Sequence, residues 1–146
     1  MSSRPFTPEQ FTATRFSTAQ DKAQFVNHFV RFVQNDFPRS QFSQPFYQQL
    51  SNTFGHIAHF NLQGFYETFF LSPATKVDFL AQTLRWVPMG SPSHTYTDAE
   101  RAIQAWLLQH QVLQTYQRRL AAAVETAERA LLAKLQAKYP TPASVS

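Results

Sequence analysis

The phenylalanines of this chain are confined to its first half. All fifteen lie between Phe6 and Phe79, and residues 80–146 contain none. The stretch from Thr97 to Tyr139 is rich in Ala, Leu, Gln and charge, and it contains neither Gly nor Pro. Those two residues are the ones that most disfavour a helix. We therefore expect an all-α fold: a Phe-rich bundle of four or five helices with a long C-terminal amphipathic helix, about residues 98–138.

Residues 1–16 lack a regular apolar period. Phe6, Phe11 and Phe16 recur every five residues, which matches neither a helical nor a strand stripe. We expect an N-terminal extended strap whose rings dock on the body. The alternative is an arm that becomes ordered only on a partner.

The Phe-rich helical body is expected over residues 17–87, and its first helix has clear ends. Thr18 and Asp21 have the spacing of a capping box, with Asp in place of the usual Glu or Gln. Apolar residues then recur at three- and four-residue steps, as on a buried helix face. Pro38 should end this helix, with extended backbone at Asp36 and Phe37 before the ring.

Three further helices are expected in the body. The second should open near Ser43 and contain Gly55 in its interior, at a cost of about 1 kcal/mol relative to Ala. A break near Gly64 precedes a short helix, and another helix starts at Pro73 and ends before Pro88.

Residues 88–97 are the clearest loop of the chain, because two prolines and a glycine fall within them. Thr97 and Glu100 then have the spacing of a full capping box, so the long helix should begin directly after Thr97. We expect this helix, residues 98–139, to pack on the body and extend beyond it. Residues 140–146 are expected to form a flexible tail.

The far end of that helix predicts a partner interface. Its apolar seam is close to a seven-residue repeat, and no later element is available to cover it. Self-association or a partner helix would cover the seam residues Leu120, Val124, Ala127, Leu131 and Leu135. A second partner epitope is expected around the loop, where exposed rings are effective anchors: Trp86, His94 and Tyr96. The alternative is that Trp86 packs in the core or at its flank.

One pair of residues has metal-like spacing. His56 and His59 lie three apart, so on a helix both imidazoles would share a face and could reach one ion. The alternative is that both rings pack in the aromatic body. A metal-dependent enzyme centred on this pair is the contrasting functional hypothesis.

Other catalytic signatures are absent from the sequence. It has no cysteine, no Gly-x-Ser-x-Gly, no phosphate-binding loop and no dinucleotide fingerprint. We therefore expect a protein that is not an enzyme and that needs no cofactor.

The charge balance raises the prospect of an anionic partner. Thirteen Lys and Arg against nine Asp and Glu give a net charge of +4. Basic residues near aromatic rings suit contact with nucleic acid, and a dispersed solvated surface is the alternative. The candidate contacts are Arg31, Arg39, Arg85, Arg118, Arg119, Arg129, Lys134 and Lys138.

No secretory signal and no membrane-spanning apolar run are visible, so a cytoplasmic location is expected, without a membrane partner. Taken together, the sequence predicts a non-enzymatic helical accessory protein. It would assemble through its long C-terminal helix and contact a macromolecular partner, nucleic acid or a nucleoprotein complex among them, through basic surface. A pure protein–protein adaptor or oligomerisation module is the alternative.

Overall fold

Helices make up all the regular structure of the described chain. The structure is a computed structural model, which describes residues 6–54, 61–85, 87–88 and 90–139. Across these residues there are six α-helices and no strand, so the expected all-α fold is confirmed. None of these helices is long and apolar enough to cross a lipid bilayer. The α-helices are α1 (Ala19–Gln34), α2 (Gln44–Thr53), α3 (Leu62–Phe69), α4 (Pro73–Arg85), α5 (Thr97–Gln109) and α6 (Val112–Lys138), and two short 3-10 helices are η1 (Pro8–Gln10) and η2 (Arg39–Gln41).

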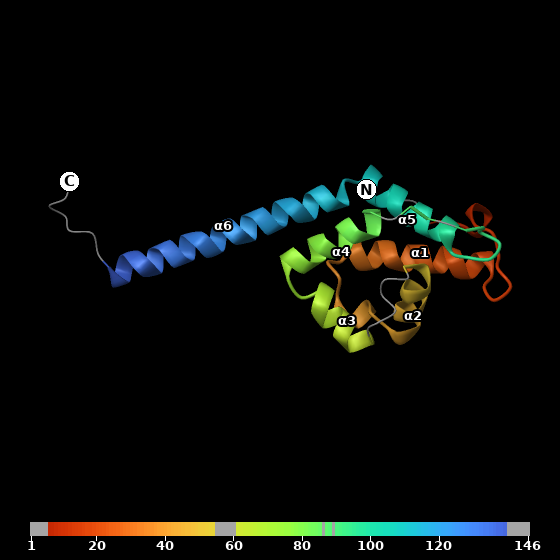
Figure 1. Cartoon of the computed structure of the whole chain (residues 1–146), viewed down its shortest axis with the longest axis horizontal. Coiled ribbons are helices and arrows are strands. Elements are labelled where there is room, and N and C mark those ends of the chain that lie inside the picture. Colours follow the sequence, from red (N-terminus) through yellow and green to blue (C-terminus); the bar gives the residue numbers. More distant parts are fainter. Residues whose placement is uncertain (1–5, 55–60, 86, 89, 140–146) are drawn as a thin grey trace.

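The body is built around α1 and a single aromatic core. Helix α1 runs through the middle, with α5 along one side and α2 and α3 on the other (Figure 1). The ring of Phe70 illustrates the packing, since its centroid lies 4.8 Å from that of Phe37 and 5.1 Å from that of Phe32. Such spacings are typical of favourable aromatic pairs. The rings that are almost completely buried are Phe25, Phe29, Phe32, Phe37, Phe42, Phe46, Phe65, Phe70 and Phe79.

The N-terminal segment lies against α1 through two of its three rings. The amide of Phe6 donates to Asn27 Oδ1 at 2.7 Å, and Asn27 Nδ2 donates back to the carbonyl of Phe6 at 2.9 Å. Phe11 is buried in the core, and its ring lies 6.2 Å from that of Phe6. Phe16 is 87 % exposed, so the third ring does not dock. Helix η1 adds a helical turn to a segment that was expected to be extended.

Helix α1 begins as expected and ends differently. The Thr18 side chain accepts the Asp21 amide, which forms the predicted capping box. At the other end Asp36 and Phe37 both have positive φ, at 65° and 55°, so the expectation of extended backbone there is wrong. The amide of Phe37 donates to the carbonyl of Phe32 at 2.8 Å, one of the hydrogen bonds of a Schellman motif. The two rings also meet at 5.2 Å, so burial of Phe37 opposes the steric cost of positive φ.

Helix α2 is shorter than the sequence predicted. Ser43 caps its first turn by accepting the amide of Phe46 at 3.3 Å. The helix ends at Thr53, and Phe54 has extended backbone with φ −115° and ψ 93°. Gly55, which was expected in the interior of this helix, lies outside the described residues. Phe54 is buried, with its ring 6.5 Å from that of Phe29, so a tertiary contact accompanies the end of the helix.

The predicted capping box of α5 does not form. Thr97 is the first residue of the helix rather than its cap, and Tyr96 occupies the cap position without a side-chain bond. The Thr97 hydroxyl is buried and has no hydrogen-bond partner among the described residues. Asp98 serves the helix start instead, because its Oδ1 accepts the Ala99 amide at 2.9 Å.

The long C-terminal helix is confirmed, but it begins at Val112 rather than near residue 98. His110 ends α5 as its C-cap, and Gln111 has a left-handed conformation with φ 52° and ψ 42°. Neither Gly nor Pro marks this joint in the sequence. The joint divides the stretch expected as one helix into α5, which packs on α1, and α6, which packs on α4 and continues past the body (Figure 1).

Candidate assembly surface

The distal part of α6 is the most exposed helix of the described chain. Every residue from 121 to 139 is exposed, and the helix extends well beyond α4 (Figure 1). Four large aliphatic side chains on this part are about half exposed, although side chains of this kind are usually buried. Their exposed fractions are 47 % for Val124, 56 % for Leu131, 55 % for Leu132 and 44 % for Leu135. We call the exposed apolar side of residues 120–135 the distal face.

The distal face continues a face that is already packed inside the chain. Leu113, Val124 and Leu135 recur at intervals of eleven residues. At about 100° per residue, eleven residues drift by only roughly 20° around a helix. Leu113 is partly buried against the core, and Leu120 is half-buried at the edge of the body. The same side of α6 therefore covers the core near its start and meets solvent further along.

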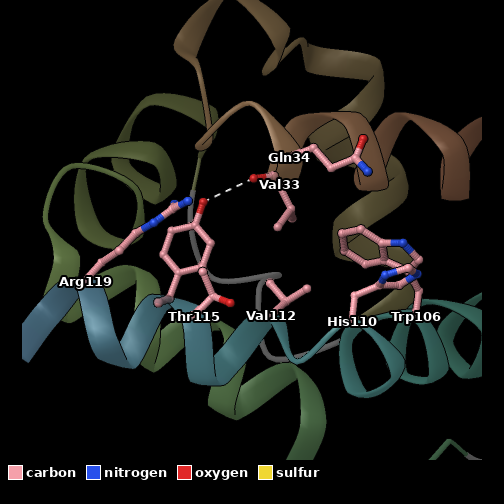
Figure 2. A pocket seen from close by; sticks show the side chains of 8 residues that line it. Val33, Gln34, Trp106, His110, Val112, Thr115 and Arg119 are labelled. Carbon is pink, nitrogen blue, oxygen red and sulfur yellow. Dashed lines mark hydrogen bonds between the residues drawn. The ribbon is translucent and has the colours of Figure 1, made fainter. Parts of the chain in front are cut away.

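The joint and first turns of α6 fix the direction in which the distal face projects. Val112 and Tyr116 are buried, and Tyr116 reaches the end of α1. Its hydroxyl lies 3.1 Å from the carbonyl oxygen of Val33 and 3.0 Å from Asp36 Oδ1, two acceptors for one proton. Figure 2 shows the bond to Val33. Burial, followed by the negative charge of Asp36, raises the pKa of Tyr116. Tyr116 thus stays neutral and anchors α6 as a hydrogen-bond donor.

Cations around Asp36 strengthen this anchor. Lys76 Nζ of α4 lies 3.0 Å from Asp36 Oδ1, and the Arg119 guanidinium lies 3.9 Å from the same oxygen. Arg119 also covers the ring of Tyr116 at 4.7 Å. Three helices, α1, α4 and α6, therefore meet at one carboxylate.

A shallow hollow lies at the joint between α5 and α6. Trp106 and His110 border one side of it and Arg119 borders the other (Figure 2), and Tyr116 also lines it. Its volume is about 210 Å³, below the roughly 300–1,000 Å³ that is usual for pockets that hold small molecules. The hollow is therefore a gap left by the change in helix direction rather than a ligand pocket.

Comparison with known proteins adds nothing to this geometry. No family model, curated protein or solved structure matches the chain.

The loop expected at residues 88–97 is held from inside by Lys22. Lys22 is fully buried in α1, and its Nζ donates to the carbonyl of Pro92 at 2.7 Å, the carbonyl of Thr95 at 2.9 Å and Asp98 Oδ1 at 2.8 Å. All three ammonium protons thus have acceptors, 70 or more residues away in the sequence. No local pattern could have indicated this role.

The residues expected to make a second partner epitope lie in different settings. Tyr96 faces the body, where its hydroxyl donates to Ser17 Oγ at 2.8 Å and its ring meets Phe25 at 5.9 Å. His94 is exposed on the loop. Trp86 lies outside the described residues.

The predicted nucleic-acid contacts are spread over several elements rather than one. Arg129 donates to Glu125 at 3.0 and 2.7 Å, and around α6 the pair Lys134 and Lys138 lies nearly opposite Arg118 and Arg129, at about 100° per residue. Arg39 donates to the carbonyl of Phe42 at 3.0 Å. The eight cations comprise Arg31 in α1, Arg39 in η2, Arg85 at the end of α4, and Arg118, Arg119, Arg129, Lys134 and Lys138 in α6.

The expected metal pair, His56 and His59, lies outside the described residues. Within the part of the chain that the structure describes, no three His, Asp or Glu side chains gather in a way that could hold a metal ion.

Proposed function

We propose that this chain is a non-enzymatic assembly protein, in which the globular body presents the distal face of α6 to an α-helix of a protein partner. The observation that carries the proposal is the run of exposed residues from 121 to 139, with four half-exposed aliphatic side chains on a helix that leaves the body. A helix laid along such a stripe would cover it, as in helix-in-groove and coiled-coil recognition.

The anchoring of α6 supports this role. A binding helix that is fixed at its base loses less orientational freedom on association than a free one. Tyr116 ties the base of α6 to the end of α1, and Lys76 bonds the same carboxylate from α4. The body would then hold α6 in a fixed direction, with the distal face exposed to a partner.

Contact with nucleic acid through basic surface has weaker support. The cations occupy several elements, and Arg129 bonds Glu125 on its own helix. A helix that reads a nucleic-acid groove would carry its cations in one stripe. Protein–protein assembly is therefore the function that we favour, and nucleic-acid contact stays a prediction that the same experiment tests.

Site-specific photo-crosslinking in the native host tests the proposal. A photoreactive p-benzoylphenylalanine placed at Leu131 samples the distal face, and the same group placed at Ala133 samples the opposite side of α6. Both positions are exposed, so the pair is matched. We expect protein adducts at Leu131 and few at Ala133, identified by mass spectrometry. Equal yields at the two positions, or adducts to nucleic acid alone at Leu131, would overturn the proposal.

A further inference from the structure

We infer that the helix that covers the distal face is the distal face of a second copy of this chain, running antiparallel to the first. The inference rests on the proposed function and names its partner. Three features support it: the face repeats along a straight helix, the body blocks a parallel arrangement, and the antiparallel register brings apolar side chains of the two faces level with each other.

The first feature is that the distal face complements itself in length and period. Val124 and Leu135 are one eleven-residue interval apart, as are Leu120 and Leu131. An eleven-residue period corresponds to about 3.67 residues per turn, close to that of a straight helix. Two such helices can therefore lie side by side over the whole exposed length, and neither needs to bend strongly.

The second feature is the position of the body. Helix α4 packs against α6 and lies beside its proximal half (Figure 1), where Leu113 is packed against the core. A second copy in parallel register would place its own proximal half in the space that α4 fills. In the structure the body gathers beside the start of α6 (Figure 1). An antiparallel copy therefore brings only its distal half to the distal face, and its body would lie past the far end of the first helix. A two-fold axis then closes the pair, whereas a staggered parallel arrangement would leave faces open at both ends.

The third feature is the register that this geometry sets. Full overlap of residues 121–138 places Val124 level with Leu135 of the second copy. Glu125 is also level with Lys134 of the second copy, but nine residues amount to half a turn at about 100° per residue, so these charges lie on opposite flanks and the apolar pair sets the register. The overlap is roughly 27 Å long at about 1.5 Å per residue. One helix pair of that length belongs with the smaller specific interfaces, near or below about 1,200 Å², so the dimer should dissociate on dilution.

Sedimentation velocity of the purified full chain tests self-association. We expect the mass to rise from monomer to dimer between about 1 and 200 μM, the range of weak complexes. The variant V124E/L131E/L135E should stay monomeric, and the matched variant A122E/T126E/A133E, with the same added charge on the opposite side of α6, should dimerise like the parent. Circular dichroism verifies that both variants keep their helices. A parent chain that stays monomeric throughout, or a pair of variants that behave alike, overturns the inference.

Disulfide trapping tests the antiparallel orientation, because the chain has no cysteine of its own. Mixing the V124C and L135C variants under oxidation should give mainly the mixed disulfide dimer. A parallel pair would instead give mainly V124C–V124C and L135C–L135C dimers, and that result would overturn the orientation.

The two proposals can fail separately. A monomeric parent chain, together with Leu131 adducts to a different protein in the host, removes self-pairing and leaves the assembly function standing. An absence of face-specific adducts at Leu131 removes the assembly function itself.

Discussion

The left-handed residue at the joint between α5 and α6 predicts how a glycine there changes the free energy of unfolding. The change is positive if the joint exists and negative if the helix is continuous. Gln111 has φ 52° and an exposed side chain, and no other residue separates His110 from the start of α6. We consider the substitution Gln111→Gly, with Gln117→Gly as the matched control. Gln117 is also exposed, but it lies inside α6.

The magnitudes follow from backbone conformation, because neither exposed side chain contributes much to packing. A residue with a Cβ is less stable in the left-handed region by about 1–2 kcal/mol, and Gly is free of that cost. Gly also gains roughly 0.5–1 kcal/mol of extra freedom in the unfolded chain. Gln111→Gly should therefore raise the free energy of unfolding by up to about 1 kcal/mol. Gln117→Gly should lower it by a similar amount, since Gly disfavours a helix interior by about 1 kcal/mol.

Urea unfolding followed by circular dichroism measures both changes, and thermal unfolding should separate the two variants by several degrees. The comparison holds if the free energy of unfolding depends on urea concentration with the same slope in the parent and in both variants. If the stretch were one continuous helix, both substitutions would destabilise equally. Loss of stability in Gln111→Gly comparable to that in Gln117→Gly would therefore refute the left-handed joint and the direction assigned to α6.

Three further substitutions probe the contacts that position α6 and the loop. Lys22→Met should lower the free energy of unfolding by about 3–5 kcal/mol, because Asp98 and two carbonyls lose the buried ammonium; a loss below 1 kcal/mol in urea unfolding would count against that burial. Thr97→Val should be neutral or stabilise by about 1 kcal/mol, since the hydroxyl has no partner, whereas a true N-cap would lose about that amount. Tyr116→Phe should cost about 1–2 kcal/mol near pH 7. In the parent, burial raises the pKa of Tyr116, so above about pH 10 the unfolded chain loses the phenol proton first and the free energy of unfolding falls with pH. The Phe variant should show a shallower fall in unfolding experiments between pH 8 and 11. An equally steep fall in the Phe variant would contradict the burial of the Tyr116 hydroxyl.

The candidate site was predictable in part. The apolar residues of the distal face, from Leu120 to Leu135, stand out in sequence because their period is helical. The structure shows that they are exposed on a projecting helix. The direction of that helix was not predictable, because it depends on Tyr116 reaching a carbonyl and a carboxylate 80 or more residues away.

The amino-acid sequence by itself determined the helical class, the start of α1 at the Thr18 cap, the start of α2 at the Ser43 cap and the apolar side of α6. Each of these follows from hydrogen bonds or periodicity within a few residues, where local chemistry decides. Tertiary structure alone decided the joint at Gln111, the failed cap at Thr97 and the burial of Lys22. At these places contacts between distant segments outweigh local preference. A strained residue or a lost cap costs roughly 1–2 kcal/mol. The burial of Val112 and Tyr116 and the hydrogen bonds to the buried ammonium stabilise the fold by more than that.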